Sequence, residues 1–255
     1  MPTITSTHRS TKIYVSSVAA MGIPINPNTP LDTNVRIPNI DFSKDYIILW
    51  VPGTNDHLVP PKFIESIRQM FGDTASLDLC DYMATWRLQT SIANGQATLM
   101  QTLDYVKAHK KKSTKIFLAG LSQGSIIISD ILANPKYAGL ITRSVLVGHP
   151  GVADHHFDYT DNVREINNPL DFATFDWGGD RQRTIQNVDM FFRGDVFAGV
   201  RLLALALHHP LDALWVAALN LHRVPFLGLP SPLRDDPHNY TEFLDDAASF
   251  LYLGK

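Results

Sequence analysis

The stretch KIFLAGLSQGSIII, residues 115–128, joins an unbroken apolar run to a second one through a Gly-x-Ser-x-Gly pattern. An apolar run without alternation predicts a strand that is buried on both faces, and the apolar run behind the pattern predicts a helix. The glycines on either side of Ser122 remove side chains that would clash in a tight turn from strand to helix. The sequence therefore predicts that Ser122 is exposed on a sharp turn at the edge of a sheet.

The same alternation of strand and helix continues on both sides of this stretch. Apolar runs predict further buried strands, and apolar residues at four-residue spacing predict the helices between them. The expected strands are 46–51, 76–79, 115–119 and 144–147, and the expected helices run from Pro60 to about Gly72, through Ile92, Leu99, Leu103 and Val106, and over 126–132. Repeated strand–helix–strand units predict an α/β fold whose central parallel sheet is covered by helices on both faces.

The pattern after residue 147 is less regular. Residues 148–183 are polar, and the last strand is expected at Val188–Phe192. Two apolar helices, around Val196–Leu207 and Leu211–Leu221, and a closing amphipathic helix over 240–253 are expected to follow. We therefore expect an N-terminal extension at 1–44 and one α/β domain at 45–255, with a helical lid or insert at about 196–230.

Composition and charge exclude several classes of protein. The 255 residues carry a net charge of −3, so neither nucleic acid nor an anionic membrane surface is expected as the main partner. The single cysteine, Cys80, forbids an intramolecular disulfide. No basic segment precedes an apolar one at the N-terminus, so we expect no signal peptide and synthesis in the cytoplasm. The apolar stretch 200–221 is interrupted by histidines, a proline and an aspartate, so no transmembrane segment is expected.

Ser122 is the candidate nucleophile of an acyl-transfer site. At the start of a helix, the amide of Gln123 would face negative charge on a reacting carbonyl oxygen, and the helix dipole would assist it. A second donor is expected in the loop after strand 46–51, where Thr54 offers an amide and a hydroxyl. The alternative for Pro52-Gly53-Thr54-Asn55 is a plain turn without a catalytic role.

A serine nucleophile needs a histidine base and a carboxylate that orients the histidine. In strand–turn–helix sites of this kind, the carboxylate follows the serine in the chain and the histidine comes last. Asp195 is the candidate carboxylate because it follows an apolar run and a glycine, and His238 is the candidate base because it lies in a loop before the last helix. The rivals are Asp176, Asp180 and Asp189 for the carboxylate, and His208, His209 and His222, within or at the end of the apolar stretch, for the base.

Three further features have two interpretations each. Residues 154–158, DHHFD, contain metal-ligand residue types, but adjacent histidines do not easily share one ion, so we interpret them as a solvated loop and expect neither metal nor cofactor. His149 follows strand 144–147. It either lines a cleft or has a structural role, and we assign it no catalytic role. The apolar insert forms a wall for an acyl chain or consists of core helices, and the expected substrate contacts are Leu202, Leu205 and Trp215.

Together these residues resemble those of the lysin B esterases of mycobacteriophages, relatives of the cutinases among the α/β-hydrolases. The matching features are Gly53-Thr54, the turn Gly120–Gly124, Gly148-His149-Pro150, Gly194-Asp195 and Pro237-His238-Asn239-Tyr240. His149 stands where the family more often has Asn or Asp, and the segment between Asp195 and His238 is short for the family. The disulfides usual in cutinases are excluded by the single cysteine.

The resemblance implies a cutinase-like α/β-hydrolase fold and a Ser122–Asp195–His238 triad. It also implies a serine esterase that hydrolyses the ester between mycolic acids and arabinogalactan during phage lysis. Such a protein is made in the host cytoplasm and acts at the mycobacterial cell envelope after release. The alternatives are a general lipid carboxylesterase, lipase or cutinase-like hydrolase, and a catalytically silent α/β-hydrolase that binds the envelope.

Overall fold

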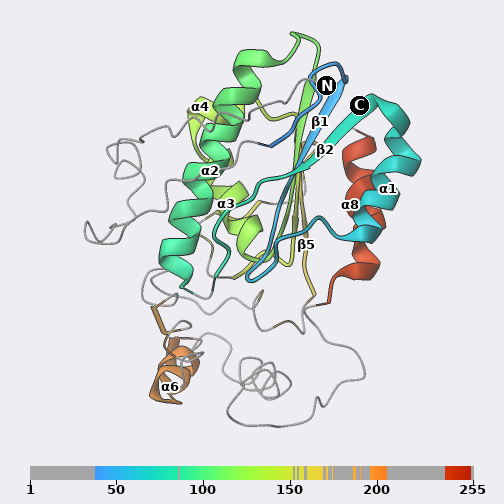
Figure 1. The fold of residues 1–255 in the computed structure, drawn as a ribbon. Helices are drawn as coiled ribbons and strands as arrows, with labels where there is room; N and C mark the ends of the chain where they lie inside the picture. Colours follow the sequence, from blue (N-terminus) through green and yellow to red (C-terminus); the bar gives the residue numbers. More distant parts are fainter. Residues whose placement is uncertain are drawn as a thin grey trace, which may run out of the picture.

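The computed structural model describes residues 38–253 except for 86, 152, 154, 158–159, 169–170, 172–173, 175–185, 188–189, 191–195 and 206–238; for Val196 and residues 202–205 it describes the backbone alone. Within these residues, five strands form one sheet in the order β2-β1-β3-β4-β5, and every neighbouring pair is parallel (Figure 1). The strands are β1 (Tyr46–Val51), β2 (Ala75–Leu79), β3 (Lys115–Leu121), β4 (Arg143–Val147) and β5 (Val163–Ile166).

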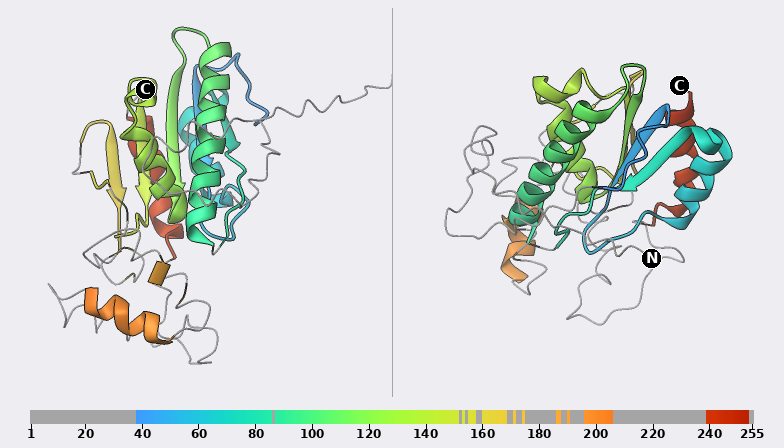
Figure 2. Two further views of the ribbon diagram at one scale, coloured as in Figure 1. Left: turned by 90° about the vertical axis from the view of Figure 1, so that its left-hand side faces the viewer. Right: turned by 45° about the horizontal axis from the view of Figure 1, so that its top comes forward.

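Helices cover both faces of the sheet, as the repeated strand–helix units predict. Figure 1 shows α1 (Pro61–Phe71) and α8 (Leu244–Tyr252) on one face, and α2 (Leu88–His109) and α3 (Gln123–Leu132) on the other. The remaining elements are the short helices η3 (Gly72–Thr74), α4 (Pro135–Ala138) and η6 (Thr241–Phe243), and α6 (Val196–Leu205). Figures 1 and 2 place α6 beyond the carboxyl edge of the sheet, apart from the covering helices.

Strand β1 shows why the strands are apolar on both faces. Ile47, Leu49 and Val51 pack in the core that includes α2 and α3, whereas Ile48 and Trp50 pack in the core that includes α1 and α8. All five side chains are fully buried. The alternation of a strand thus divides one apolar run between two cores, which a parallel sheet with two covering layers requires.

Helix α1 confirms the stripe expected from its sequence. Phe63, Ile67 and Phe71 recur at four-residue spacing and are buried on one side of the helix. The ring of Phe63 lies 4.9 Å from that of Trp50, centroid to centroid. Proline at the first helical position and a glycine with φ of 55° after the last residue mark the two ends.

The sequence analysis did not identify the fifth strand. This strand is β5, inside the segment expected to be irregular; of the strand expected at Val188–Phe192 only Met190 lies within the described residues, and it is helical. Strand β5 reads Val-Arg-Glu-Ile and lies at the edge of the sheet, where only its two apolar ends are buried. A four-residue edge strand of this kind lacks the continuous apolar run by which the inner strands are recognised.

The apolar insert is described only in part. Helix α6 confirms helical backbone at Val196–Leu205, including the positions of Leu202 and Leu205. The expected helix at Leu211–Leu221, the remainder of the insert to residue 230 and residues 1–37 of the expected extension lie outside the described residues. Among the described helices, none has the length and apolar character needed to cross a bilayer.

Candidate active site

Ser122 lies on the predicted turn, directly between β3 and α3. Its φ of 52° and ψ of −115° are sparsely populated for a residue with a side chain, so this backbone is strained. The turn is fixed from β4, because the Val147 carbonyl accepts hydrogen bonds from the Ser122 amide at 2.8 Å and from Ser125 Oγ at 3.0 Å. Such a strained strand-to-helix turn is the geometry by which a nucleophilic serine is lifted above the edge of a sheet.

The two glycines of the pattern are required by close approaches of the backbone. A Cβ atom added to Gly124 would lie 2.1 Å from the Val51 carbonyl oxygen, and one added to Gly120 would lie 2.8 Å from the Gly124 carbonyl carbon. Both distances are far below a van der Waals contact. Glycine at both positions therefore allows α3 to start directly against the end of β1, with Ser122 at the tip.

The amides around Ser122 suit the stabilisation of an oxyanion. Gln123 is the first residue of α3, and no side-chain cap is made at Ser122. Among the described residues, no group accepts a hydrogen bond from the Gln123 amide, which therefore stays available at the positive end of the helix dipole.

The loop after β1 brings Thr54 close to the same point. A Cβ atom added to Gly53 would lie 3.5 Å from the Cβ of Ser122, so Gly53 is a direct neighbour of Ser122. The loop is fixed by Asn55, whose φ is 59° and whose amide donates to the Ala84 carbonyl at 2.8 Å. Thr54 is half-buried, and its amide has no acceptor in the described part of the chain. Gln123 directly follows Ser122 in the chain, and Thr54 directly follows Gly53, which contacts Ser122. Both oxyanion residues predicted from the sequence therefore lie close to Ser122.

The Gln123 side chain has a role that sequence reasoning did not identify. It is 2% exposed, and its Oε1 lies 2.9 Å from Tyr82 Oη and 2.8 Å from Ser91 Oγ, while Nε2 donates to the Thr85 carbonyl at 3.2 Å. Tyr82 Oη is also 2.8 Å from the Pro52 carbonyl oxygen. Gln123 and Tyr82 thus connect the segment before α2 to the Ser122 turn and to the loop after β1. In the sequence, this structural role of Gln123 is indicated only by its position directly after the serine of the motif.

The two expected triad partners, Asp195 and His238, lie outside the described residues, as do their rivals Asp176, Asp180, Asp189, His208, His209 and His222. The expected substrate contact Trp215 also lies outside, and for Leu202 and Leu205 only the backbone is described. On α6, Phe197 and Val200 are 75% and 59% exposed, whereas Ala198 is fully buried.

Tyr240, two residues after His238, is anchored at the carboxyl edge of the sheet. Its hydroxyl donates to Asp171 Oδ2 at 2.9 Å and accepts from the Asn168 amide at 3.0 Å. Its ring lies against Gly148, which directly follows β4 and has a φ of 57°. Burial raises the pKa of Tyr240, so the hydroxyl stays protonated as a donor. The chain therefore enters the last helix one strand away from the end of β3, which leads into Ser122.

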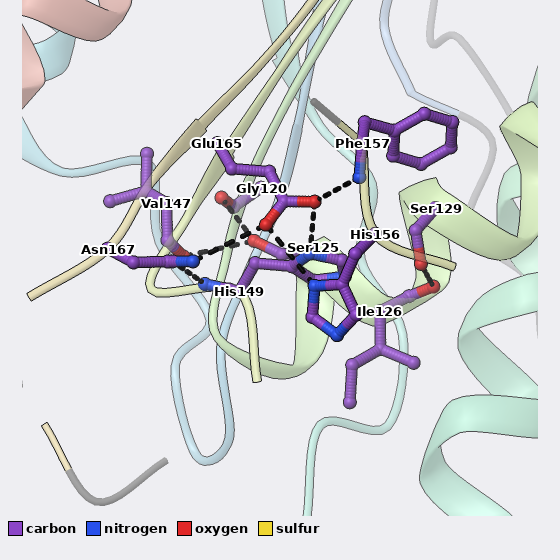
Figure 3. Close-up of polar contacts among 10 residues, drawn as sticks. All are labelled: Gly120, Ser125, Ile126, Ser129, Val147, His149, His156, Phe157, Glu165 and Asn167. Carbon is purple, nitrogen blue, oxygen red and sulfur yellow. Dashed lines mark hydrogen bonds and ion pairs between the residues drawn. The ribbon is translucent and has the colours of Figure 1, made fainter. Parts of the chain in front are cut away.

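A second polar cluster, close to the start of α3, includes His149 (Figure 3). Figure 3 shows two imidazole rings in contact with the Glu165 carboxylate: His149 Nδ1 is 3.0 Å from Oε1, and His156 Nδ1 is 3.3 Å from Oε2. His149 is fully buried, so it does not line an open cleft. His156 is exposed, in keeping with the expected solvated loop, but it also contacts the carboxylate.

The surroundings set the charges of this cluster. Burial lowers the pKa of His149, and the nearby Glu165 only partly offsets this, so the imidazole is neutral. Burial raises the pKa of Glu165, but its contacts with His149, His156 and the Phe157 amide more than offset this and hold the pKa well below its ordinary value. One ligand atom from each of His149, His156 and Glu165 lies within 4.8 Å of the others, and these residues are the candidate metal ligands among the described residues.

Comparison with known proteins supports the fold assignment. No protein-family model and no curated protein matches the chain. Among solved structures, lysin B from Mycobacteriophage D29 is similar over 82% of this chain and 99% of its own, with 16% identity and a TM-score of 0.50. An acetylxylan esterase (82% and 97% covered, 10% identity, TM-score 0.49) and a Trichoderma reesei cutinase (82% and 76% covered, 20% identity, TM-score 0.44) are also similar. The chain has the expected cutinase-like α/β-hydrolase fold, and identities this low concern the fold alone.

Proposed function

We propose that this protein is a serine ester hydrolase with Ser122 as its nucleophile. The observation that carries the proposal is the strained backbone of Ser122 at the start of α3, beside the available amides of Gln123 and Thr54. A strained turn of this kind persists only where the surrounding structure holds it in place. Here glycines and hydrogen bonds from β1, β3 and β4 do so.

In the proposed mechanism, His238 accepts the Ser122 proton while Oγ attacks the ester carbonyl carbon. The carbonyl electron pair moves onto oxygen, where the amides of Gln123 and Thr54 donate hydrogen bonds to it. When the oxyanion collapses, the alcohol leaves with the proton from His238; water then repeats the sequence and releases the acid. Asp195 holds the imidazole in the required orientation. The anchoring of Tyr240 at the same edge of the sheet supports His238 in this role.

For the substrate, we propose a lipid ester with a long acyl chain. The exposed Phe197 and Val200 on α6, beyond the carboxyl edge of the sheet, support an apolar wall on the side where Ser122 is presented. By the family resemblance, the specific bond is the ester between mycolic acids and arabinogalactan, and the site of action is the mycobacterial cell envelope during phage lysis.

The test is hydrolysis of p-nitrophenyl esters of increasing acyl length by the wild type, Ser122→Ala and Ser43→Ala. Ser43 is an exposed serine distant in the chain, so its variant serves as the matched control. We expect loss of hydrolysis in Ser122→Ala alone and higher kcat/KM for long chains. Release of free mycolates from purified mycolyl-arabinogalactan would then establish the specific bond. Unchanged hydrolysis by Ser122→Ala would overturn the nucleophile, and no hydrolysis by the wild type would favour a silent binding protein.

A further inference from the structure

The cluster of His149, His156 and Glu165 is not used by the proposed ester hydrolysis. His149 follows β4, Glu165 lies in β5, and His156 belongs to the connection between these two strands. Figure 3 shows the three side chains converging beside the first turn of α3. Three segments of the outer sheet therefore direct nitrogen and oxygen atoms to one point.

The buried side chain of His149 lacks hydrogen bonds from described residues to both of its ring nitrogens. His149 is fully buried, yet neither of its ring nitrogens makes a hydrogen bond of suitable geometry with a described residue. The Nδ1 atom is only 3.0 Å from Glu165 Oε1, but this close approach does not have the geometry of a hydrogen bond. Buried polar atoms without hydrogen bonds are rare in native structures, and a ring nitrogen that binds a metal ion is one case in which no hydrogen bond is needed.

From this convergence we propose that His149, His156 and Glu165 form a binding site for Zn²⁺. In a tetrahedral zinc site, bonds of about 2.0–2.1 Å place neighbouring ligand atoms about 3.3 Å apart. His149 Nδ1 lies 3.0 Å from Glu165 Oε1, and His156 Nδ1 lies 3.3 Å from Oε2 of the same carboxylate. One ligand atom from each residue lies within 4.8 Å of the others, so any pair of ligand atoms has to close by at most about 1.5 Å.

The chemistry of the set favours zinc over calcium or magnesium. Two imidazole nitrogens and one carboxylate are ligands typical of Zn²⁺, whereas Ca²⁺ and Mg²⁺ prefer oxygen alone. Zinc binds imidazole as the neutral ring and the carboxyl group in its ionised form. The His156 side chain is 47% exposed, so the proposed site adjoins solvent.

The site would join the outer strands close to the nucleophile turn. His149 lies two residues after Val147, whose carbonyl accepts the hydrogen bonds of Ser122 and Ser125. The bound ion would fasten the connection that carries His156 to both β4 and β5. Its expected effect is therefore on stability, independently of whether the chain hydrolyses esters.

The experiment compares the chelator-treated wild type with His156→Ala, Glu165→Gln and His155→Ala. His155 is the exposed neighbour of His156 and lies outside the cluster, so it is the matched control for loss of a surface histidine. Each protein is incubated with Zn²⁺ and separated from free metal, and the bound zinc is measured by mass spectrometry. Thermal unfolding with and without Zn²⁺ is followed by circular dichroism, which also shows that each metal-free variant folds.

We expect one Zn²⁺ per chain in the wild type and His155→Ala, with a higher Tm in its presence. His156→Ala and Glu165→Gln should bind Zn²⁺ at least about tenfold more weakly and lose the rise in Tm. Loss of a residue that only supports a metal ligand already weakens metal binding about tenfold or more, and these variants lose a ligand itself. Co²⁺ in place of Zn²⁺ should give the intense visible absorption of a four-coordinate site. Absence of bound zinc in the wild type, or equal binding by His156→Ala and His155→Ala, would overturn the proposal.

Discussion

Substitution of Gly124 by alanine tests whether the nucleophile turn depends on close backbone contact. The added Cβ would lie 2.1 Å from the Val51 carbonyl oxygen and 2.7 Å from that of Pro52. Ordinary contacts of a Cβ atom begin at 3.4 Å, so α3 and β1 would have to separate by about 1.3 Å. Both obstructing atoms are backbone, and no flexible side chain can move away to relieve the clash.

The cost follows from which elements must move. Val51 is paired with Gly120 between β1 and β3, so a shift of β1 disturbs the centre of the sheet. Overpacking of a core typically costs about 1–3 kcal/mol, and with backbone as the obstacle we expect about 3 kcal/mol of lost unfolding free energy. A displacement of about 1 Å at a catalytic group lowers the rate about 100-fold, so hydrolysis by the folded variant should fall by that order.

Gly139→Ala is the matched control for this change. Gly139 has a φ of −74°, and an added Cβ meets nothing within 4 Å. Alanine there should leave stability unchanged or raise it by up to about 1 kcal/mol, because it restricts the unfolded chain. Urea unfolding followed by circular dichroism gives the free energies, and p-nitrophenyl ester hydrolysis gives the rates. If Gly124→Ala unfolds within about 1 kcal/mol of the wild type and keeps its activity, the steric argument is refuted.

Two further changes test the buried polar groups. Gln123→Leu should lower the unfolding free energy by about 1–3 kcal/mol, because the Thr85 carbonyl loses its buried hydrogen-bond donor. Gln69→Leu, at an exposed glutamine, is the control and should change the unfolding free energy by less than about 0.5 kcal/mol. Equal effects of the two substitutions in urea unfolding would contradict this prediction. Burial raises the pKa of Cys80 from 9.0 to about 12, so between these values the unfolded chain loses a proton that the folded chain keeps, and stability falls as pH rises. Above pH 9, the unfolding free energy of the wild type should therefore fall up to about 1.4 kcal/mol per pH unit more steeply than that of Cys80→Ala, and parallel slopes in urea unfolding would argue against this origin.

The nucleophile turn could be predicted because all its determinants are local in the sequence. A buried strand, two glycines and an apolar helix follow one another within residues 115–132, and each has a pattern of its own. The first strand and the stripe of α1 were predictable for the same reason. Asp195 and His238 depend on contacts between distant segments, and for these residues the chain order and the family resemblance remain the basis of the prediction.

The polar clusters could not be predicted because they depend on tertiary contacts. Glu165 lies in an edge strand whose sequence lacks an apolar run, so neither the strand nor the contact of Glu165 with His149 was predicted. The two adjacent histidines at 155 and 156 were considered together and rejected as a metal-binding pair, whereas the structure brings His156 to the carboxylate without its neighbour. Spacing along the chain carries no information on which of two exposed neighbours turns toward a residue in the next strand.

The catalytic proposal depends more on backbone contacts than on the apolar core. The Ser122 amide donates a hydrogen bond to the Val147 carbonyl of β4, and α3 packs directly against β1 because Gly124 has no side chain. The buried amide of Gln123 adds a third connection, to the segment before α2. Because three segments constrain the turn independently, the unfavourable φ of Ser122 can persist without a compensating side-chain cap. Apolar core substitutions should therefore reduce stability before they affect hydrolysis, whereas changes at the turn should affect both together.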